Sequence, residues 1–135
     1  MRIDFDIHGK VQAKQRPRFN GKYAYTPEKT RNYESWVKLW FVTKYKDFKP
    51  LEKPLRVCIY AYFPIPTSKS KKVREEMSKG IIKPTIKPDT DNIAKSILDA
   101  LNGLAFIDDK QVYELYVRKE YGIVPYARVI IEECE

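Results

Sequence analysis

The sequence contains no long apolar run, and this absence argues against a membrane protein. A transmembrane helix needs about 20 consecutive apolar residues, and no stretch of the 135 residues approaches that length. The first residues, Met1–Asp4, also lack the apolar core of a signal peptide. We therefore expect a cytoplasmic protein that does not bind membranes.

The sequence also contains few cysteines, histidines and glycines. Cys58 and Cys134 have no metal-ligand spacing; one disulfide is an option, but two reduced thiols fit a cytosolic protein better. The single histidine, His8, is not surrounded by a nucleophile and an orienting group, so a triad built on it is not expected. A Gly-rich phosphate loop is absent as well.

The charge balance is strongly basic. Lys and Arg number 26 against 18 Asp and Glu, which gives a net charge of +8. This excess fits a polyanionic partner, although many basic proteins are merely soluble. The length of 135 residues predicts a single domain spanning 1–135, long enough to bury a core.

The most informative acidic residues occur in one segment, 87–109. Pro88 favours an extended approach to Asp89, and alternate residues of an extended chain point the same way, about 6.6 Å apart. Asp89 and Asp91 would then share a face, with Asp91 capping the helix that follows. Apolar residues recur at three- and four-residue intervals up to Leu101, and Gly103 suits the left-handed position after a helix.

Further charged residues follow at helical spacing and after the helix. Lys95 lies one turn after Asp91, so its amine can reach back toward the carboxylates. Asp99, a further turn along, is better interpreted as a solvated partner of Lys95. Asp108 and Asp109 open the next expected strand, in which neighbours face opposite sides, so only one of them should join the site directly.

These carboxylates predict a divalent-metal site. Hard oxygen ligands suit Mg²⁺ or Mn²⁺, and Mg²⁺ commonly uses only one or two protein carboxylates beside water and phosphate oxygens. One ion is sufficient, or two about 3.5–4 Å apart as in many nucleases. A simpler interpretation is that Asp89 begins a turn and Asp91 caps a helix. A calcium loop fits poorly, because Ala94 stands where glycine is needed and Ala100 where glutamate belongs.

Two basic segments are candidates for contacts with nucleic acid. Residues 14–19 are followed by the hairpin signal Asn20–Gly21 and two tyrosines, which could stack on bases or pack on the domain. Residues 65–88 carry seven basic against two acidic residues, and Ser70 is expected to cap a short helix that closes at Gly80. A solvated face is the plainer alternative. The predicted DNA-binding residues are Lys14, Arg16, Arg18, Lys69, Lys71, Lys72, Arg74 and Lys87.

The remaining elements predict an α+β fold. Strands are expected over residues 3–8 and 55–63, the second of them central, and over 111–121 and 126–132 as a hairpin. Thr26–Pro27 should begin a helix that fades by Lys46. Its aromatic stripe is expected in the core, or in part at a dimer seam. Together these elements predict a two-layer sandwich, a mixed sheet with its helices mainly on one face.

The ordered motifs resemble those of the RusA family of Holliday junction resolvases, which occur in bacteria, phages and prophages. The resemblance covers most of the chain and rests on Lys87–Lys95, Leu98–Gly103 and Asp108–Val112, with Arg16–Phe19 and Tyr25–Pro27 in support. It implies a small α/β fold, a homodimer, a need for Mg²⁺ or Mn²⁺, and symmetric cutting of four-way DNA junctions in recombination and repair. By the same resemblance, Asp89, Asp91 and Asp109 match the catalytic and metal-binding aspartates, Lys95 matches the functional lysine, and Asp108 has a weaker metal role.

The expected activity is therefore metal-assisted hydrolysis of a phosphodiester, leaving a 5′-phosphate and a 3′-hydroxyl. A non-catalytic protein that binds structured DNA is the main alternative. An enzyme that uses the Asp-x-Asp pair to hold a metal–nucleotide fits less well, because nothing else in the sequence suggests a nucleotide pocket.

Overall fold

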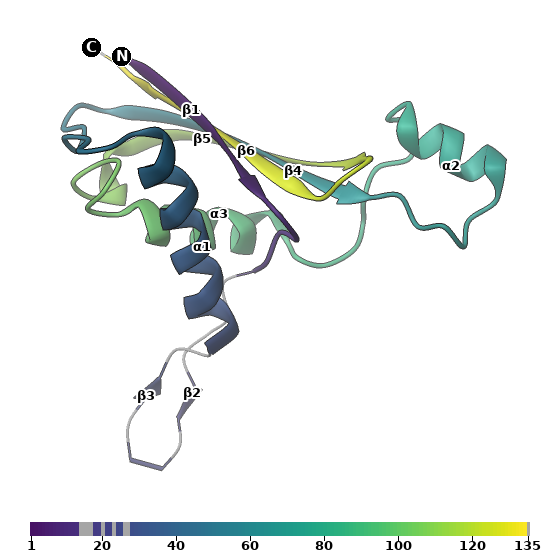
Figure 1. Ribbon diagram of the computed structural model, residues 1–135, viewed down its shortest axis with the longest axis horizontal. Helices are drawn as coiled ribbons and strands as arrows, with labels where there is room; N and C mark the ends of the chain where they lie inside the picture. Colours follow the sequence, from purple (N-terminus) through teal and green to yellow (C-terminus); the bar gives the residue numbers. More distant parts are fainter. Residues whose placement is uncertain (14–17, 20, 23, 26–27, 135) are drawn as a thin grey trace.

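The structure of the protein, a computed structural model, describes residues 1–13, 18–19, 21–22, 24–25 and 28–134 (Figure 1). The elements, in chain order, are β1 (Arg2–His8), β2 (Arg18–Phe19), β3 (Ala24–Tyr25), α1 (Glu28–Lys44), β4 (Leu55–Pro64), α2 (Lys71–Ser78), α3 (Thr90–Leu101), the 3₁₀ turn η1 (Asp109–Gln111), β5 (Val112–Gly122) and β6 (Tyr126–Glu133).

Four strands form a mixed sheet in the order β1-β6-β4-β5. β1 and β4 both pair with β6 in antiparallel fashion, while β4 and β5 are parallel. The predicted central position of β4 is confirmed. The predicted hairpin of β5 and β6 is wrong, because β4 lies between them. A parallel pair needs a long crossover connection, and α2 and α3 both lie in the segment that joins β4 to β5.

Helices α1 and α3 pack against one face of this sheet, which confirms the two-layer α+β prediction (Figure 1). Alternation along each strand directs the apolar side chains to that face; in β4, Leu55, Val57 and Ile59 are buried while their neighbours are not. Phe5 of β1 meets Phe41 of α1 edge to face, with ring centroids 5.5 Å apart. The core therefore lies between the sheet and the two helices.

The expected aromatic stripe of α1 is buried only in part. Tyr33, Val37 and Phe41 belong to the core, and Trp40 packs against it. Trp36 is 41% exposed. Its indole Nε1 donates a hydrogen bond to the backbone carbonyl of His8, the last residue of β1. The described part of α1 ends at Lys44, in agreement with the prediction, whereas the expected start at Thr26–Pro27 lies outside the described residues.

Other local expectations can be compared directly with the structure. β2 and β3 pair antiparallel, as the hairpin signal predicted, although Asn20 and Tyr23 lie outside the described residues. Both cysteines are free thiols. Within the described part of the chain, no helix is long and apolar enough to cross a membrane.

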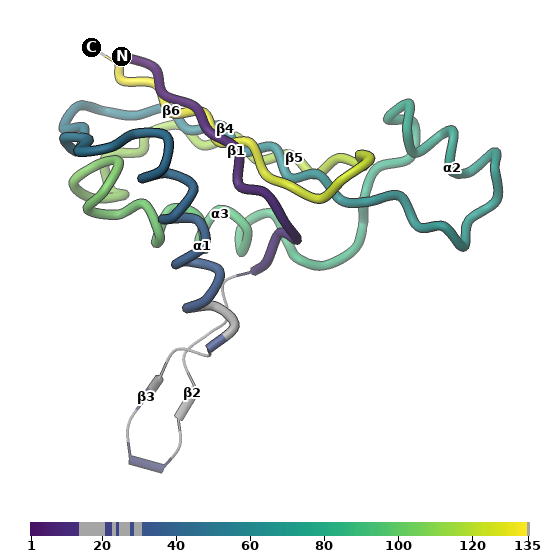
Figure 2. Tube along the Cα trace, in the orientation of Figure 1, coloured from purple at the N-terminus to yellow at the C-terminus, as the bar shows by residue number. Residues whose placement is uncertain are grey.

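Helix α2 projects beyond the ends of the strands, as the chain trace shows (Figure 2). Its amino end is capped by Ser70, whose hydroxyl accepts a hydrogen bond of 3.3 Å from the Val73 amide. Gly80, with φ of 76°, follows the helix in the left-handed region that glycine tolerates best. The predicted short helix and both of its end signals are thereby confirmed.

Candidate active site

The amino end of α3 presents the first two aspartates. Asp89, not Asp91, occupies the N-cap position, and its side chain makes no capping hydrogen bond. Asp91 lies in the first helical turn, so the predictions that the chain stays extended through Asp91 and that Asp91 caps the helix are wrong. Both side chains are exposed. The partial positive charge at a helix amino end favours nearby carboxylates, which suits two acidic groups at this place.

A strand lysine holds the turn that precedes Asp89. Lys119 of β5 donates from Nζ to the Pro88 carbonyl at 3.1 Å and also to the Ile86 carbonyl. The Lys87–Pro88 peptide bond of this turn is cis. The start of α3 is therefore connected directly to the sheet edge.

The solvent-facing side of α3 carries Lys95 and Asp99. Lys95 Nζ lies 3.1 Å from Asp99 Oδ1, which confirms Asp99 as the partner of this lysine. Lys95 is one turn from Asp91 on the same side of the helix, and its side chain is 57% exposed. Its ammonium group is therefore open to an approaching phosphate.

The second acidic pair begins a 3₁₀ turn and not a strand, which corrects the sequence prediction. Asp108 caps η1, accepting a hydrogen bond of 2.9 Å from the Lys110 amide, while its own amide donates to Gln111 Oε1 at 2.8 Å. The Lys110 amide lowers the pKa of Asp108. Gln111 Nε2 in turn donates to the Leu51 and Lys53 carbonyls. Asp108 thus has a structural role in this turn.

Asp109 lies in a different electrostatic setting from its neighbour. Partial burial raises its pKa most, followed by its hydrogen bond with Asp108 and the Asp108 charge. The charge of Lys95 lowers the same pKa and that of Asp99 raises it. Asp109 therefore lies within electrostatic reach of the Lys95–Asp99 pair of α3.

The described residues do not gather a complete metal-ligand cluster. Among them, no three His, Cys, Asp or Glu side chains lie together so that they could hold an ion. The donor chemistry nevertheless fits a hard divalent cation, since the exposed groups are carboxylates and Mg²⁺ commonly uses one or two of them with water and substrate phosphates.

A cavity of about 400 Å³ adjoins the amino end of α3. Residues 10–13, which follow β1, line it together with Lys87, Pro88, Asp89 and Asn92. The Ser96 hydroxyl donates to the Gln12 carbonyl at 3.1 Å and fixes this segment against α3. Gln12 Oε1 is buried and has no partner within the described structure. The segment that precedes the basic residues 14–19 in the sequence therefore runs beside Asp89.

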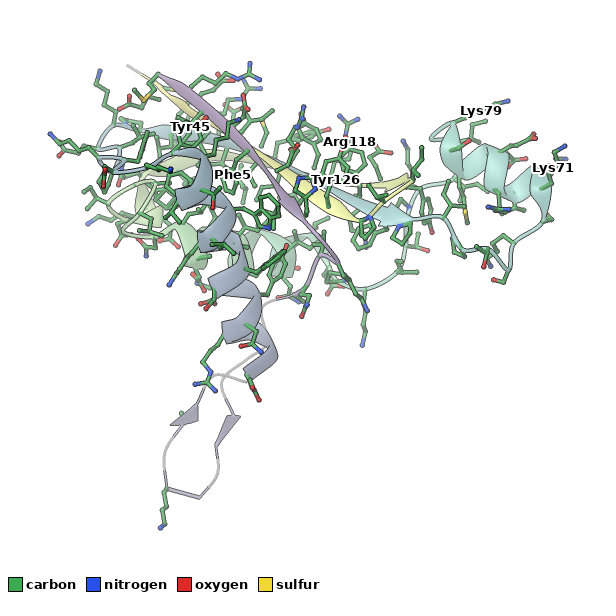
Figure 3. All side chains as sticks on the ribbon, viewed as in Figure 1. Phe5, Tyr45, Lys71, Lys79, Arg118 and Tyr126 are labelled. Atoms are coloured by element: carbon green, nitrogen blue, oxygen red, sulfur yellow. The ribbon has the colours of Figure 1, made fainter. Side chains whose placement is uncertain are left out.

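The predicted DNA-binding residues that the structure describes come from several separate segments. Lys71, Lys72 and Arg74 are exposed on α2, beyond the ends of the strands (Figure 3). Lys69 and Lys87 are exposed before and after that helix. Arg18 belongs to β2, whereas Lys14 and Arg16 lie outside the described residues.

Two comparisons with known proteins bear on identity. The family model described as Endodeoxyribonuclease RusA matches residues 8–132. A Bacillus subtilis (strain 168) protein, called Uncharacterized protein YqaN, is 36% identical over 137 residues, which cover 97% of this chain and 96% of that protein. The chain belongs to the RusA family. Membership implies an endodeoxyribonuclease with Holliday junction resolvase activity in general, and RusA-like resolvases generally depend on divalent metals.

One residue beside the candidate site that sequence reasoning missed is Lys119. A signal for it was present, because this lysine falls between Val117 and Tyr121 on the apolar side of an alternating strand. A lysine at an inward position usually has a specific partner. The partners themselves, two carbonyls of a distant turn, could not be read from the sequence.

Proposed function

We propose that the protein is a metal-dependent endonuclease that resolves four-way DNA junctions by paired, symmetric nicks during recombination and repair. Each cut would leave a 5′-phosphate and a 3′-hydroxyl, ends that ligase can seal. The protein would act as a homodimer, because two-fold symmetry matches the two equivalent strands of the junction.

The observation that best supports this proposal is the grouping of acidic and basic residues along α3. Asp89 and Asp91 lie at its amino end, and Lys95 lies one turn further on. Asp109 interacts electrostatically with Lys95 and with Asp99. A general DNA-binding surface has no need for carboxylates, which repel phosphate, so their presence within a basic protein favours catalysis.

Asp89, Asp91 and Asp109 would hold Mg²⁺ or Mn²⁺, with Asp108 in a weaker role. When bound, such an ion supplies a Lewis acid for the scissile phosphate and lowers the pKa of a water molecule. Lys95 places a positive charge where the phosphoryl oxygens would lie, so it either stabilises the charge that develops there or positions the nucleophile.

The basic residues would bind the arms of the junction. Lys69, Lys71, Lys72, Arg74 and Lys87 are exposed in the described structure, and Lys14, Arg16 and Arg18 follow residues 10–13 in the sequence, with Arg18 in β2. Lys and Arg contacts to phosphates supply affinity that is independent of sequence and falls with salt. Such contacts suit an enzyme that recognises DNA shape.

The deciding experiment incubates the protein with an end-labelled four-way junction and with a linear duplex of the same sequence, each with EDTA, Mg²⁺ or Mn²⁺. We expect paired nicks at symmetric positions in the junction only, in the presence of either ion, with ends that ligase reseals. Binding of the junction without any cut in either metal would instead identify a non-catalytic, structure-selective DNA-binding protein.

A further inference from the structure

The outer edge of β5 differs from the other edge of the sheet. Among the residues that the structure describes, β5 is the longest strand, with 11 residues, and β4 is its only neighbour in the sheet. Within the described part of the chain, no backbone hydrogen bond joins Tyr113–Tyr121 to any element except β4. An edge of this length offers a row of free amide and carbonyl groups to another strand.

The opposite edge of the sheet is blocked by a side chain. Tyr45 lies beside β1, where its hydroxyl accepts from the Asp4 amide and donates to the Asp4 carbonyl, each at 3.0 Å. Lys44 adds an ion pair of 2.9 Å to the Asp4 carboxylate. Proteins commonly protect edges in such ways. β1 is therefore protected against pairing. Among the described residues, β5 carries no such block along Tyr113–Arg118, and it is only further on that Lys119 and Glu120 contact residues 83–88.

Apolar side chains are also exposed along the open edge. Tyr113, Leu115 and Tyr116 are 61%, 45% and 47% exposed, respectively. Beside the second half of the strand lies a hollow of about 550 Å³, lined by residues 117–119 on one side and by Lys83, Pro84, Asp89 and Thr90 on the other. The strand therefore has free backbone groups, exposed apolar surface and adjacent space.

We propose that the β5 edge is the dimer interface, where β5 of a second copy of this chain pairs with it antiparallel about a two-fold axis at Tyr116. The inference rests on the homodimer of the proposed function and names the surface that forms it. The paired sheets would become one continuous eight-stranded sheet. The helices of both copies would lie on the same face, because an axis perpendicular to the sheet preserves its two faces.

The sequence of β5 is self-complementary in this register. Glu114 of each copy lies opposite Arg118 of the other, which gives two pairs of opposite charges on the face away from the helices. Leu115 of each copy lies opposite Val117 of the other on the helix face. Cross-strand pairs of opposite charge and of apolar residues each stabilise antiparallel strands.

Neighbouring registers lose this complementarity. Residues directly opposite each other in an antiparallel pair must point to the same face of the sheet. The two-fold axis must therefore pass between two copies of the same residue. The positions nearest to Tyr116 that could hold the axis are Leu115 and Val117. An axis at Val117 places Glu114 opposite Glu120, a repulsive pair. An axis at Leu115 places Arg118 opposite Val112 and leaves no ionic pair. Tyr116 is therefore the favoured centre.

Cysteine cross-linking tests the position of the axis. Tyr116→Cys is made in a Cys58→Ser and Cys134→Ser background, because Cys58 lies directly across from Tyr116 within the same chain and would compete. Opposite residues of an antiparallel pair have Cβ atoms about 4.5–5.5 Å apart, so mild oxidation or a short bis-maleimide should link most chains into dimers. The matched control is Leu39→Cys in the same background, on the outer side of α1 and 51% exposed; it should stay monomeric on denaturing gels.

Charge exchange tests the register. Sedimentation should show that Glu114→Arg and Arg118→Glu each raise the dimer dissociation constant at least tenfold, and that the double variant returns to within threefold of the native value. Asp4→Arg is the matched control. It removes the ion pair between Asp4 and Lys44, just as Glu114→Arg removes the ion pair between Glu114 and Arg56 within the same chain. It should leave dimerisation unchanged.

The outcomes separate this inference from the proposed function. Dimers that are unaffected by either single charge variant, or that the Tyr116→Cys substitution does not cross-link, would overturn the β5 interface even if junctions are cut. A monomer that cuts junctions would also overturn it while leaving the nuclease intact. Conversely, a dimer that Tyr116→Cys cross-links and that responds to the charge exchange, but cuts no junction with Mg²⁺ or Mn²⁺, would confirm the interface and refute the proposed function.

Discussion

Lys119 Nζ and the Pro88 carbonyl oxygen are 3.1 Å apart, although 31 residues separate the two in sequence. The same ammonium group donates to the Ile86 carbonyl and lies 5.8 Å from the centre of the Phe63 ring. The lysine thus joins the sheet to the turn from which α3 and Asp89 begin. This contact therefore links the candidate active site directly to the sheet.

Lys119→Met should therefore impair cleavage more than binding. Methionine keeps much of the apolar length but leaves the two carbonyls without their donor, and hydrogen bonds from a charged group contribute about 1.5–3 kcal/mol. We expect a loss of about 1–2 kcal/mol in the free energy of unfolding and at least a tenfold fall in the single-turnover cutting rate. Lys38→Met, at an exposed position of α1, is the control. A native cutting rate in the Lys119 variant would show that the contact does not organise the site.

The aspartate roles are tested by isosteric substitution. Asp89→Asn, Asp91→Asn and Asp109→Asn should each reduce junction cutting by at least a hundredfold, because an amide is a weaker ligand for a hard cation. Junction binding should remain or become tighter, since repulsion of phosphate falls. Asp47→Asn, remote in sequence from α3 and exposed, should cut normally. If all three variants cut normally, the assignment of these aspartates is wrong.

Local sequence signals predicted local structure well. Ser70 and Gly80 marked both ends of α2, and Gly103, with φ of 83°, occupies the left-handed position expected after α3. These features depend on residues within one turn of each other, so propensity and capping chemistry are sufficient. Alternation along β1 and β4 similarly identified which side chains face the core.

The pairing of strands and the detailed geometry of the site were harder to predict from the sequence. A short connection between β5 and β6 suggested a hairpin, but β4 pairs with both strands and separates them. The cap of α3 was also predicted at the wrong residue, Asp91 in place of Asp89, because either aspartate satisfies the preference for an N-cap. The 3₁₀ turn at Asp109–Gln111 has a local signal that sequence reasoning missed, the capping box formed by Asp108 and Gln111. The hydrogen bonds from Gln111 to the Leu51 and Lys53 carbonyls are long-range and could not be read from the sequence.

Substitution of Lys95 tests its role in catalysis without a large change in the stability of the fold. Its pair with Asp99 is exposed, and exposed ion pairs of this spacing contribute only about 0.3–0.5 kcal/mol. Lys95→Ala should therefore unfold within about 0.5 kcal/mol of the native protein yet cut junctions at least tenfold more slowly at saturating protein. Asp99→Ala breaks the same pair and serves as the matched control. Equal slowing in both variants would assign the effect to the pair and not to the ammonium group.

The basic helix α2 should contribute affinity through phosphates. Lys71 and Lys72 are exposed there, and Figure 3 shows Lys71 at the end of the helix far from the sheet. Each phosphate contact contributes about 0.9 to the slope of log binding constant against log salt concentration. Reversing both charges to Glu should therefore flatten the slope by about 1.8 and weaken junction binding, while the cutting rate of the saturated complex changes little.

The matched control for α2 reverses two exposed lysines of the segment after α1, Lys46 and Lys49. Both double variants have the same net charge, so a general field effect would weaken binding equally in both. A contact to DNA predicts that only the α2 variant flattens the salt slope. Equal slopes in the two variants would refute α2 as a DNA-binding element and leave the overall charge as the source of affinity.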